Sequence, residues 1–185
     1  MKRMLALLIV LLIFSGCAGE NELSQAMALR QKILTEKGYA FDAVITADYG
    51  EKLYTFGVAC QSDATGTLQF NVISPETIAG ITGTLSPKGG QLTFDDKMLA
   101  FELLVEEQLS PISMPWVVMH SVGSGFIRSS GNDGEDLYIQ IDDSYAGESL
   151  QIDLWCDKTV LPKYAEILYR GKRILSMKIE NFRFL

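Results

Sequence analysis

The sequence predicts a mainly β fold: an unclosed antiparallel half-barrel of about ten strands, with one helix before the strands and a helical lid inserted among them. Three observations predict it. Apolar and polar residues alternate through most of the chain, as they do in strands with one buried face. Gly, Asp or Pro stands at most of the short turns between these segments. Two other segments carry apolar residues at helical spacing.

The N-terminus has the composition of an export signal. Lys2 and Arg3 precede an uninterrupted apolar run, Met4–Phe14, and small residues then lead to Cys17. A run of this length is about 16 Å long as a helix, whereas a bilayer span needs roughly 20 apolar residues. The sequence therefore predicts a signal peptide over residues 1–16.

The boundary Phe14-Ser15-Gly16-Cys17 resembles the lipobox of bacterial lipoproteins. The resemblance implies that Cys17 receives acyl chains such as palmitate and becomes the first residue after cleavage. Residues 17–22 would then be the lipid anchor and tether, and residues 23–185 one domain. The alternative is an ordinary signal peptide with an incidental cysteine. Either way we expect export. Lipidation would hold the domain at the periplasmic face of an outer membrane, or outside the cell membrane where there is only one.

The charge of the chain excludes one class of partner. The full sequence carries a formal charge of −7, and removal of Lys2 and Arg3 with the signal leaves 14 basic and 23 acidic residues, a charge of −9. Phosphate backbones require a basic face, so we expect no nucleic-acid partner. We also expect a monomer without a cofactor, held to the membrane by its anchor.

The spacing of the apolar residues predicts where the helices and strands lie along the chain. Residues Leu23–Lys37 predict an amphipathic helix that stops at Gly38, and Pro111 and Pro115 open a second helical segment between Glu106 and Val122. The alternating segments predict these strands: Tyr39–Tyr49, Tyr54–Cys60, Leu68–Val72, Ile78–Leu85, Gln91–Asp95, Met98–Leu103, Leu137–Ile141, Leu150–Cys156, Pro162–Tyr169 and Ile174–Phe184.

A long antiparallel sheet curls, and two short helices are few to cover its apolar face. This predicts an apolar concavity of the kind that binds ligands. The alternative is that the same side chains fill a dry core. The residues expected to line the cavity are Phe41, Ile45, Phe56, Val58, Phe70, Val72, Phe94 and Trp116.

Three stretches resemble the superfamily of the periplasmic lipoprotein carrier and the outer-membrane lipoprotein receptor, the LolA/LolB-like proteins. Residues Phe70–Gly83 resemble its strand, proline-containing loop and returning strand. Residues Leu109–Val117 resemble its inserted helix, and Ile174–Phe182 its final strand. The resemblance implies an unclosed barrel whose cavity binds apolar ligands such as lipoprotein acyl chains, for transfer or insertion. An alternative on the same fold is an envelope-stress sensor or protein-interaction module.

The resemblance also implies roles for single residues. Ile78 sits where the receptor has an exposed apolar residue on a protruding loop; alternatively, Ile78 begins a strand and is buried. The carrier has an arginine near the start of its barrel that ties the sheet to the lid, and Tyr39–Tyr49 contains none.

The residue types needed for catalysis or metal binding are scarce. His120 is the only histidine and lies in an apolar helical segment, which favours a packed side chain, so we expect no enzyme activity. Asn132–Asp136 lacks the ligand spacing of a calcium loop and predicts a hairpin turn. No metal site is expected. Cys60 and Cys156 end two strand patterns on the apolar side, and either a disulfide or two buried thiols is compatible with export.

Overall fold

A computed structural model of the chain describes residues 20–185 except 49, 51, 96, 103, 106, 107 and 146. The signal segment and Cys17 lie outside the described residues. The described residues form thirteen strands, two α-helices and one short 3₁₀ helix, which follow in chain order. Their bounds are α2 Glu20–Thr35, β1 Tyr39–Asp48, β2 Leu53–Ser62, β3 Leu68–Ser74, β4 Thr82–Ser86, β5 Gly89–Phe94, β6 Lys97–Phe101, β7 Leu104–Val105, β8 Gln108–Leu109, η1 Pro111–Ser113, α3 Met114–Ser124, β9 Phe126–Asp133, β10 Asp136–Tyr145, β11 Glu148–Cys156, β12 Pro162–Tyr169 and β13 Lys172–Phe184.

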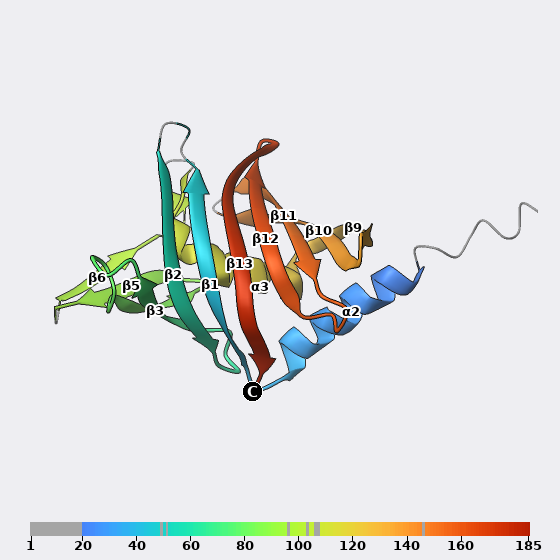
Figure 1. Ribbon diagram of the computed structural model, residues 1–185, viewed down its shortest axis with the longest axis horizontal. Helices are drawn as coiled ribbons and strands as arrows, with labels where there is room; N and C mark the ends of the chain where they lie inside the picture. The colour runs from blue at the N-terminus through green and yellow to red at the C-terminus, as the bar shows by residue number, and fades with distance from the viewer. Residues whose placement is uncertain are drawn as a thin grey trace, which may run out of the picture.

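Eleven of these strands form one antiparallel sheet in the order β6-β5-β4-β3-β2-β1-β13-β12-β11-β10-β9. Every neighbouring pair is a hairpin except β1 with β13, which joins the two halves of the chain (Figure 1). The end strands, β6 and β9, are not joined, so the described sheet is unclosed, as the sequence predicts. Strands β7 and β8, which form a separate hairpin, and strand β9 are absent from the predicted strands.

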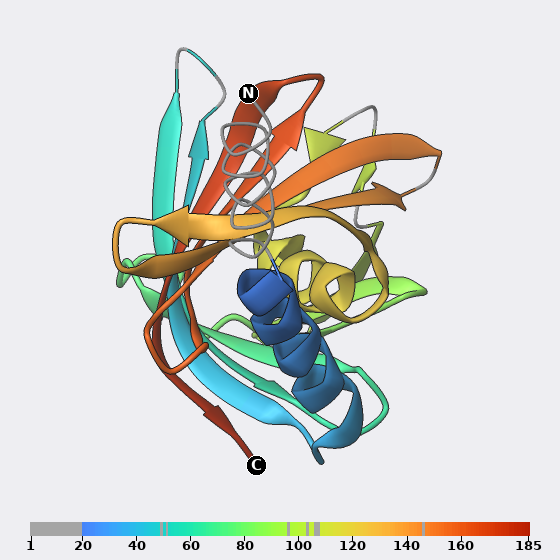
Figure 2. The same cartoon turned by 90° about the vertical axis from the view of Figure 1, so that its right-hand side faces the viewer.

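The sheet curves around both helices, which lie in its hollow (Figure 2). Alternation sets which side chains point inward: Phe41, Ala43 and Ile45 of β1 are buried, and the residues between them are more exposed. Helix α3 is apolar almost all round, and its residues from Met114 to Met119 are all buried. A helix with no polar face must be enclosed, and α3 fills the middle of the hollow.

One predicted strand boundary was wrong. Residues 75–80 form a turn, and β4 begins at Thr82, so Ile78 does not start a strand. The turn is closed by backbone bonds from Ile78 N to Pro75 O at 3.1 Å and from Gly80 N to Val72 O at 2.9 Å. The bond to Val72 keeps the turn against β3. The predicted hairpin turn near Gly134 is confirmed, since Asp133 pairs with Asp136.

Candidate functional site

An apolar pocket of about 490 Å³ lies on the concave side of β2 to β5. The turn between β3 and β4 and the 3₁₀ helix η1, which leads into α3, form its other walls. The volume falls within the roughly 300–1,000 Å³ typical of ligand pockets. Its lining residues are Tyr54, Thr55, Phe56, Phe70, Val72, Pro75, Thr77, Ile78, Ile81, Leu92, Ser110, Pro111 and Ile112.

The pocket has a buried floor and an exposed rim. Phe70 and Val72 of β3 are only 3% and 4% exposed and form the floor, and Phe56 of β2 is half-buried above them. At the rim, Tyr54 is 50% exposed. An apolar ligand could therefore lose water against the floor while a polar end stays at the mouth.

Glycine at position 83 makes room for the floor. Gly83 pairs with Phe70 across β3 and β4. A Cβ added at Gly83 would stand 2.5 Å from Cζ of Phe70 and 2.1 Å from the carbonyl oxygen of Gln91. The Phe70 ring therefore occupies the space above β4 that a side chain at residue 83 would need.

The side chains that line the pocket are uncharged. None of the thirteen residues that line the pocket carries a formal charge, and the polar groups among their side chains are hydroxyls. Such a surface offers no counter-charge for an ionic ligand and favours hydrocarbon, because a buried charge without a partner is costly. Among the described residues, no group of three or more His, Cys, Asp or Glu side chains could hold a metal ion.

The structure brings four of the sequence-predicted residues together at this pocket: Phe56, Phe70, Val72 and Ile78. Ile78 is half-buried against the core, not projecting alone into solvent. The pocket therefore includes the turn that the resemblance singled out.

The other predicted lining residues lie elsewhere. Ile45 and Val58 have no exposed surface and belong to the core, and Phe41 stacks against Phe182 with ring centroids 5.7 Å apart. Phe94, at the end of β5, is 45% exposed and does not line the pocket. Trp116 of α3 donates from Nε1 to the Gly66 carbonyl at 2.9 Å.

Trp116 and His120 line a different pocket of about 240 Å³ between α2 and α3. The His120 ring stacks on the Trp116 ring with centroids 4.4 Å apart. Desolvation lowers the pKa of His120, although the nearby Asp143 opposes the shift. The histidine is thus a packed surface group, as its sequence context suggests.

Cys60 and Cys156 are both free and buried, which is the buried-thiol alternative of the two that the sequence left open. Cys60 lies on β2 and Cys156 on β11, and three strands separate β2 from β11 in the sheet. Burial raises the pKa of the Cys156 thiol to about 12 and that of Cys60 further. Both thiols behave as small apolar core residues.

Sequence reasoning missed the side chains that hold the lid. Arg30 of α2 donates from Nε to Val122 O at 2.7 Å and from Nη2 to Gly125 O at 2.6 Å, at the C-terminal end of α3. On the other side of α3, Ser121 Oγ donates to Asp143 Oδ2 of β10 at 2.8 Å. The only available signal was Arg30 itself, a charge within the apolar stripe of its helix.

Within the described part of the chain, no helix is long and apolar enough to cross a membrane. Comparison with known sequences gives no match to any family model or curated protein.

A search of solved structures finds proteins that are similar to this chain over most of its length. An uncharacterized conserved protein from Thermus thermophilus matches with a TM-score of 0.49 at 10% identity, over 88% of this chain and 87% of that one. A LolA superfamily protein from Nitrosomonas europaea matches with a TM-score of 0.47 at 8% identity, over 86% and 93%. LprF from Mycobacterium bovis matches with a TM-score of 0.46 at 10% identity, over 90% and 95%.

Proposed function

We propose that this chain is an exported, non-enzymatic lipoprotein, anchored through Cys17, that binds acyl chains of a lipid or lipoprotein for transfer or insertion. The observation that carries the proposal is the uncharged apolar pocket under β2 to β5. Burial of each methylene there contributes about 0.8 kcal/mol. Because this gain has no direction, the pocket would discriminate chain length more than headgroup.

The exposed rim suits a ligand with one polar end. Tyr54 and Thr77 provide hydroxyls at the mouth, and both residues are exposed. A carboxylate or ester at the end of an acyl chain would remain in contact with water and these hydroxyls. The hydrocarbon tail would lie against Phe56, Phe70 and Val72.

The anchor and the pocket fit a single task. Two residues separate Cys17 from Glu20, the first residue of α2, so a lipid on Cys17 would hold the domain close to a membrane. One acyl chain anchors a protein weakly and two or more anchor it stably. We place the protein at the periplasmic face of an outer membrane, or outside the cell membrane where there is only one.

Binding of cis-parinaric acid tests the proposal. A protein that begins at Ala18 retains the whole core, because the buried apolar cluster lies between Ala26 and Ile179. We expect the fluorescence of cis-parinaric acid to rise when it binds this protein. Addition of palmitate should displace the probe and reverse the rise. Ile78→Asp places a charge in the pocket and should weaken binding at least tenfold.

The matched control is Phe126→Asp. Phe126 is 71% exposed at the start of β9 and does not line the pocket. Its substitution should leave binding unchanged. Equal losses in both variants, or no binding displaceable by palmitate, would defeat the proposal.

One observation favours the alternative of an interaction module. Met98 and Leu99 of the edge strand β6 are 69% and 60% exposed. An apolar edge strand can accept an extended segment of another protein as an added strand. If binding of another protein at β6 were the main function, Met98→Lys would abolish that binding. Palmitate would then have no effect on the binding of the other protein.

A further inference from the structure

A second pocket, of about 310 Å³, lies on the outer face of the sheet, opposite the side on which the acyl site is proposed. It lies over β9 to β12 and the hairpin turn after Tyr169. Inward residues of β10 and β11, such as Ile141 and Ile152, are fully buried, so the residues between them point outward. The lining residues are Arg128, Asp142, Glu148, Ser149, Gln151, Leu168, Tyr169, Arg170 and Gly171.

The charges in this pocket cancel. Arg128 and Arg170 contribute two positive groups, and Asp142 and Glu148 two negative ones. Arg128 Nη1 lies 3.5 Å from Asp142 Oδ2. The hydroxyl of Tyr169 donates to Glu148 Oε2 at 2.7 Å. An anion or a cation would meet both signs, whereas a neutral hydroxyl can donate to a carboxylate and accept from a guanidinium.

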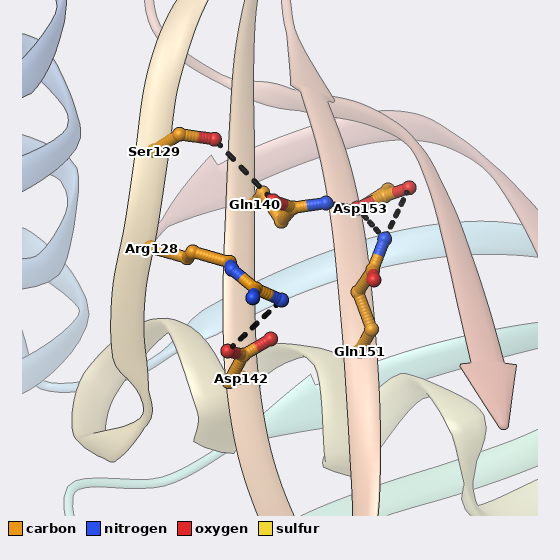
Figure 3. Close-up of polar contacts among 6 residues, drawn as sticks. All are labelled: Arg128, Ser129, Gln140, Asp142, Gln151 and Asp153. Carbon is orange, nitrogen blue, oxygen red and sulfur yellow. Dashed lines mark hydrogen bonds and ion pairs between the residues drawn. The ribbon is translucent and has the colours of Figure 1, made fainter. Parts of the chain in front are cut away.

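A ladder of hydrogen-bonded polar groups runs beside the pocket across β11, β10 and β9 (Figure 3). Gln151 Nε2 donates to both carboxylate oxygens of Asp153, at 3.0 and 3.2 Å. Gln140 Nε2 reaches Asp153 Oδ1 at 3.5 Å, and Ser129 Oγ reaches Gln140 Oε1 at 3.5 Å. Asp153 is buried, at 8% exposure, and fixes the two amides, so the remaining donor and acceptor positions of Gln140 and Gln151 are presented in a set pattern.

Three aromatic rings end the ladder. Trp155 lies between Tyr138 and Tyr164, with ring centroids 5.1 and 5.3 Å away. Its Nε1 donates to Asp133 Oδ2 at 2.9 Å. All three rings are partly exposed, on the face of the sheet that is turned away from the core. Aromatic pairs across strands stabilise a sheet, but they also offer apolar ring surface beside hydrogen-bonding groups.

We propose that this outer face is a binding site for a neutral oligosaccharide. A sugar ring has apolar C–H faces and a rim of hydroxyls, which match aromatic rings flanked by planar amides, carboxylates and guanidinium groups. Trp155 and Gln151 are four residues apart on one strand, or roughly 13 Å at 3.3 Å per residue, which leaves room for more than one sugar ring. The site is separate from the acyl pocket and shares no residue with it.

Calorimetric titration of the protein that begins at Ala18 tests the site. The probes are maltohexaose, cellohexaose and hexa-N-acetylchitohexaose, which are neutral and differ in their sugars and linkages. We expect at least one to bind with a micromolar to millimolar dissociation constant. Arg128→Ala, at an exposed side chain, should weaken that binding at least tenfold, and Trp155→Ala should do the same.

Arg183→Ala is the matched control, because Arg183 is an exposed arginine on β13 outside the outer pocket. It should leave sugar binding unchanged. Circular dichroism checks that each variant folds, and should Trp155→Ala unfold, Arg128→Ala decides. In Arg128→Ala, palmitate should displace cis-parinaric acid as it does in the unchanged protein. This result would separate the sugar site from the acyl site. Binding of none of the three sugars at millimolar concentration, or unchanged binding in Arg128→Ala, would overturn the proposal.

Discussion

Arg30 shows how a single side chain can hold the lid. Its guanidinium donates to the carbonyl of Val122 in the last turn of α3 and to that of Gly125 directly after the helix, where carbonyls need partners from outside the helix. A cation at a helix C-terminus is also favoured by the helix dipole. Burial lowers the pKa of Arg30, but a guanidinium stays charged at any ordinary pH.

Replacement of Arg30 should therefore cost much more than loss of a surface ion pair. We expect Arg30→Ala to lower the free energy of unfolding by about 1.5–3 kcal/mol, the range for hydrogen bonds to charged groups. Urea unfolding measures it. Arg128→Ala, which removes an exposed ion pair, should cost less than about 1 kcal/mol. Similar losses in the two variants would show that Arg30 does not hold α3.

Asp63 organises the turn between β2 and β3. Thr65 Oγ1 donates to Asp63 Oδ1 at 2.6 Å and holds the pKa of the carboxyl below its usual value. The backbone N–H groups of Thr65 and Thr67 donate to the same oxygen, at 2.8 and 3.2 Å. Asp157 repeats the arrangement between β11 and β12, where Thr159 donates in the same way.

The lowered pKa of Asp63 predicts a dependence of stability on pH. Its contribution is complete above the unfolded-state pKa of about 4 and is lost as the pH falls through the lower folded-state pKa. Asp63→Asn cannot ionise, so the advantage of the wild type over this variant should shrink in acid. Urea unfolding at a series of pH values measures the difference. A difference that stays constant from neutral pH to about pH 2 would contradict the prediction.

At the scale of elements, β3 forms the floor of the apolar pocket with Phe70 and Val72, and β4 lies against Phe70. Phe70 can lie over β4 only because residue 83 has no side chain. Gly131 of β9 provides a contrast, since a Cβ added there would meet nothing within 4 Å.

This contrast predicts different outcomes for two similar substitutions. Gly83→Ala should destabilise the protein by about 1–3 kcal/mol, as overpacking does, and should weaken cis-parinaric acid binding. Gly131→Ala should leave both properties nearly unchanged. Thermal unfolding and fluorescence titration measure the two effects. A Gly83→Ala protein with normal stability and binding would refute this account of the floor.

The alternating pattern was enough to predict which faces of the strands point inward. It could not predict which inward side chains pack in the core and which line the pocket. Phe41, Ile45 and Val58 do point inward, as predicted. They are core residues because α3 and the neighbouring strands fill their part of the hollow, which depends on tertiary packing. Ile78 was assigned to a strand by its apolar neighbours, whereas the backbone bonds around it make a turn. Likewise, no local pattern shows that Arg30 reaches a helix more than ninety residues away.

At the scale of the whole molecule, the curved sheet has two faces with different chemistry. The concave face is apolar, and the part that α3 leaves unfilled is the pocket beside η1. The outer face over β9 to β12 carries hydrogen-bonding groups and three aromatic rings. The pairing of β1 with β13 joins strands β2 to β5, which carry the pocket, to strands β9 to β12, which carry the polar outer surface, in one continuous sheet. One domain could thus bind a hydrocarbon on one side and a sugar on the other.

The central claim is that a hydrocarbon chain occupies the concave pocket. Nuclear Overhauser contacts between palmitate and the isoleucine and leucine methyl groups of the protein test it most directly. The account predicts contacts from the acyl chain to Ile78, Ile112 and Leu92. Contacts only to exposed groups on other faces, such as Leu34 of α2, would contradict it, as would a complex in which palmitate contacts no methyl group of the pocket.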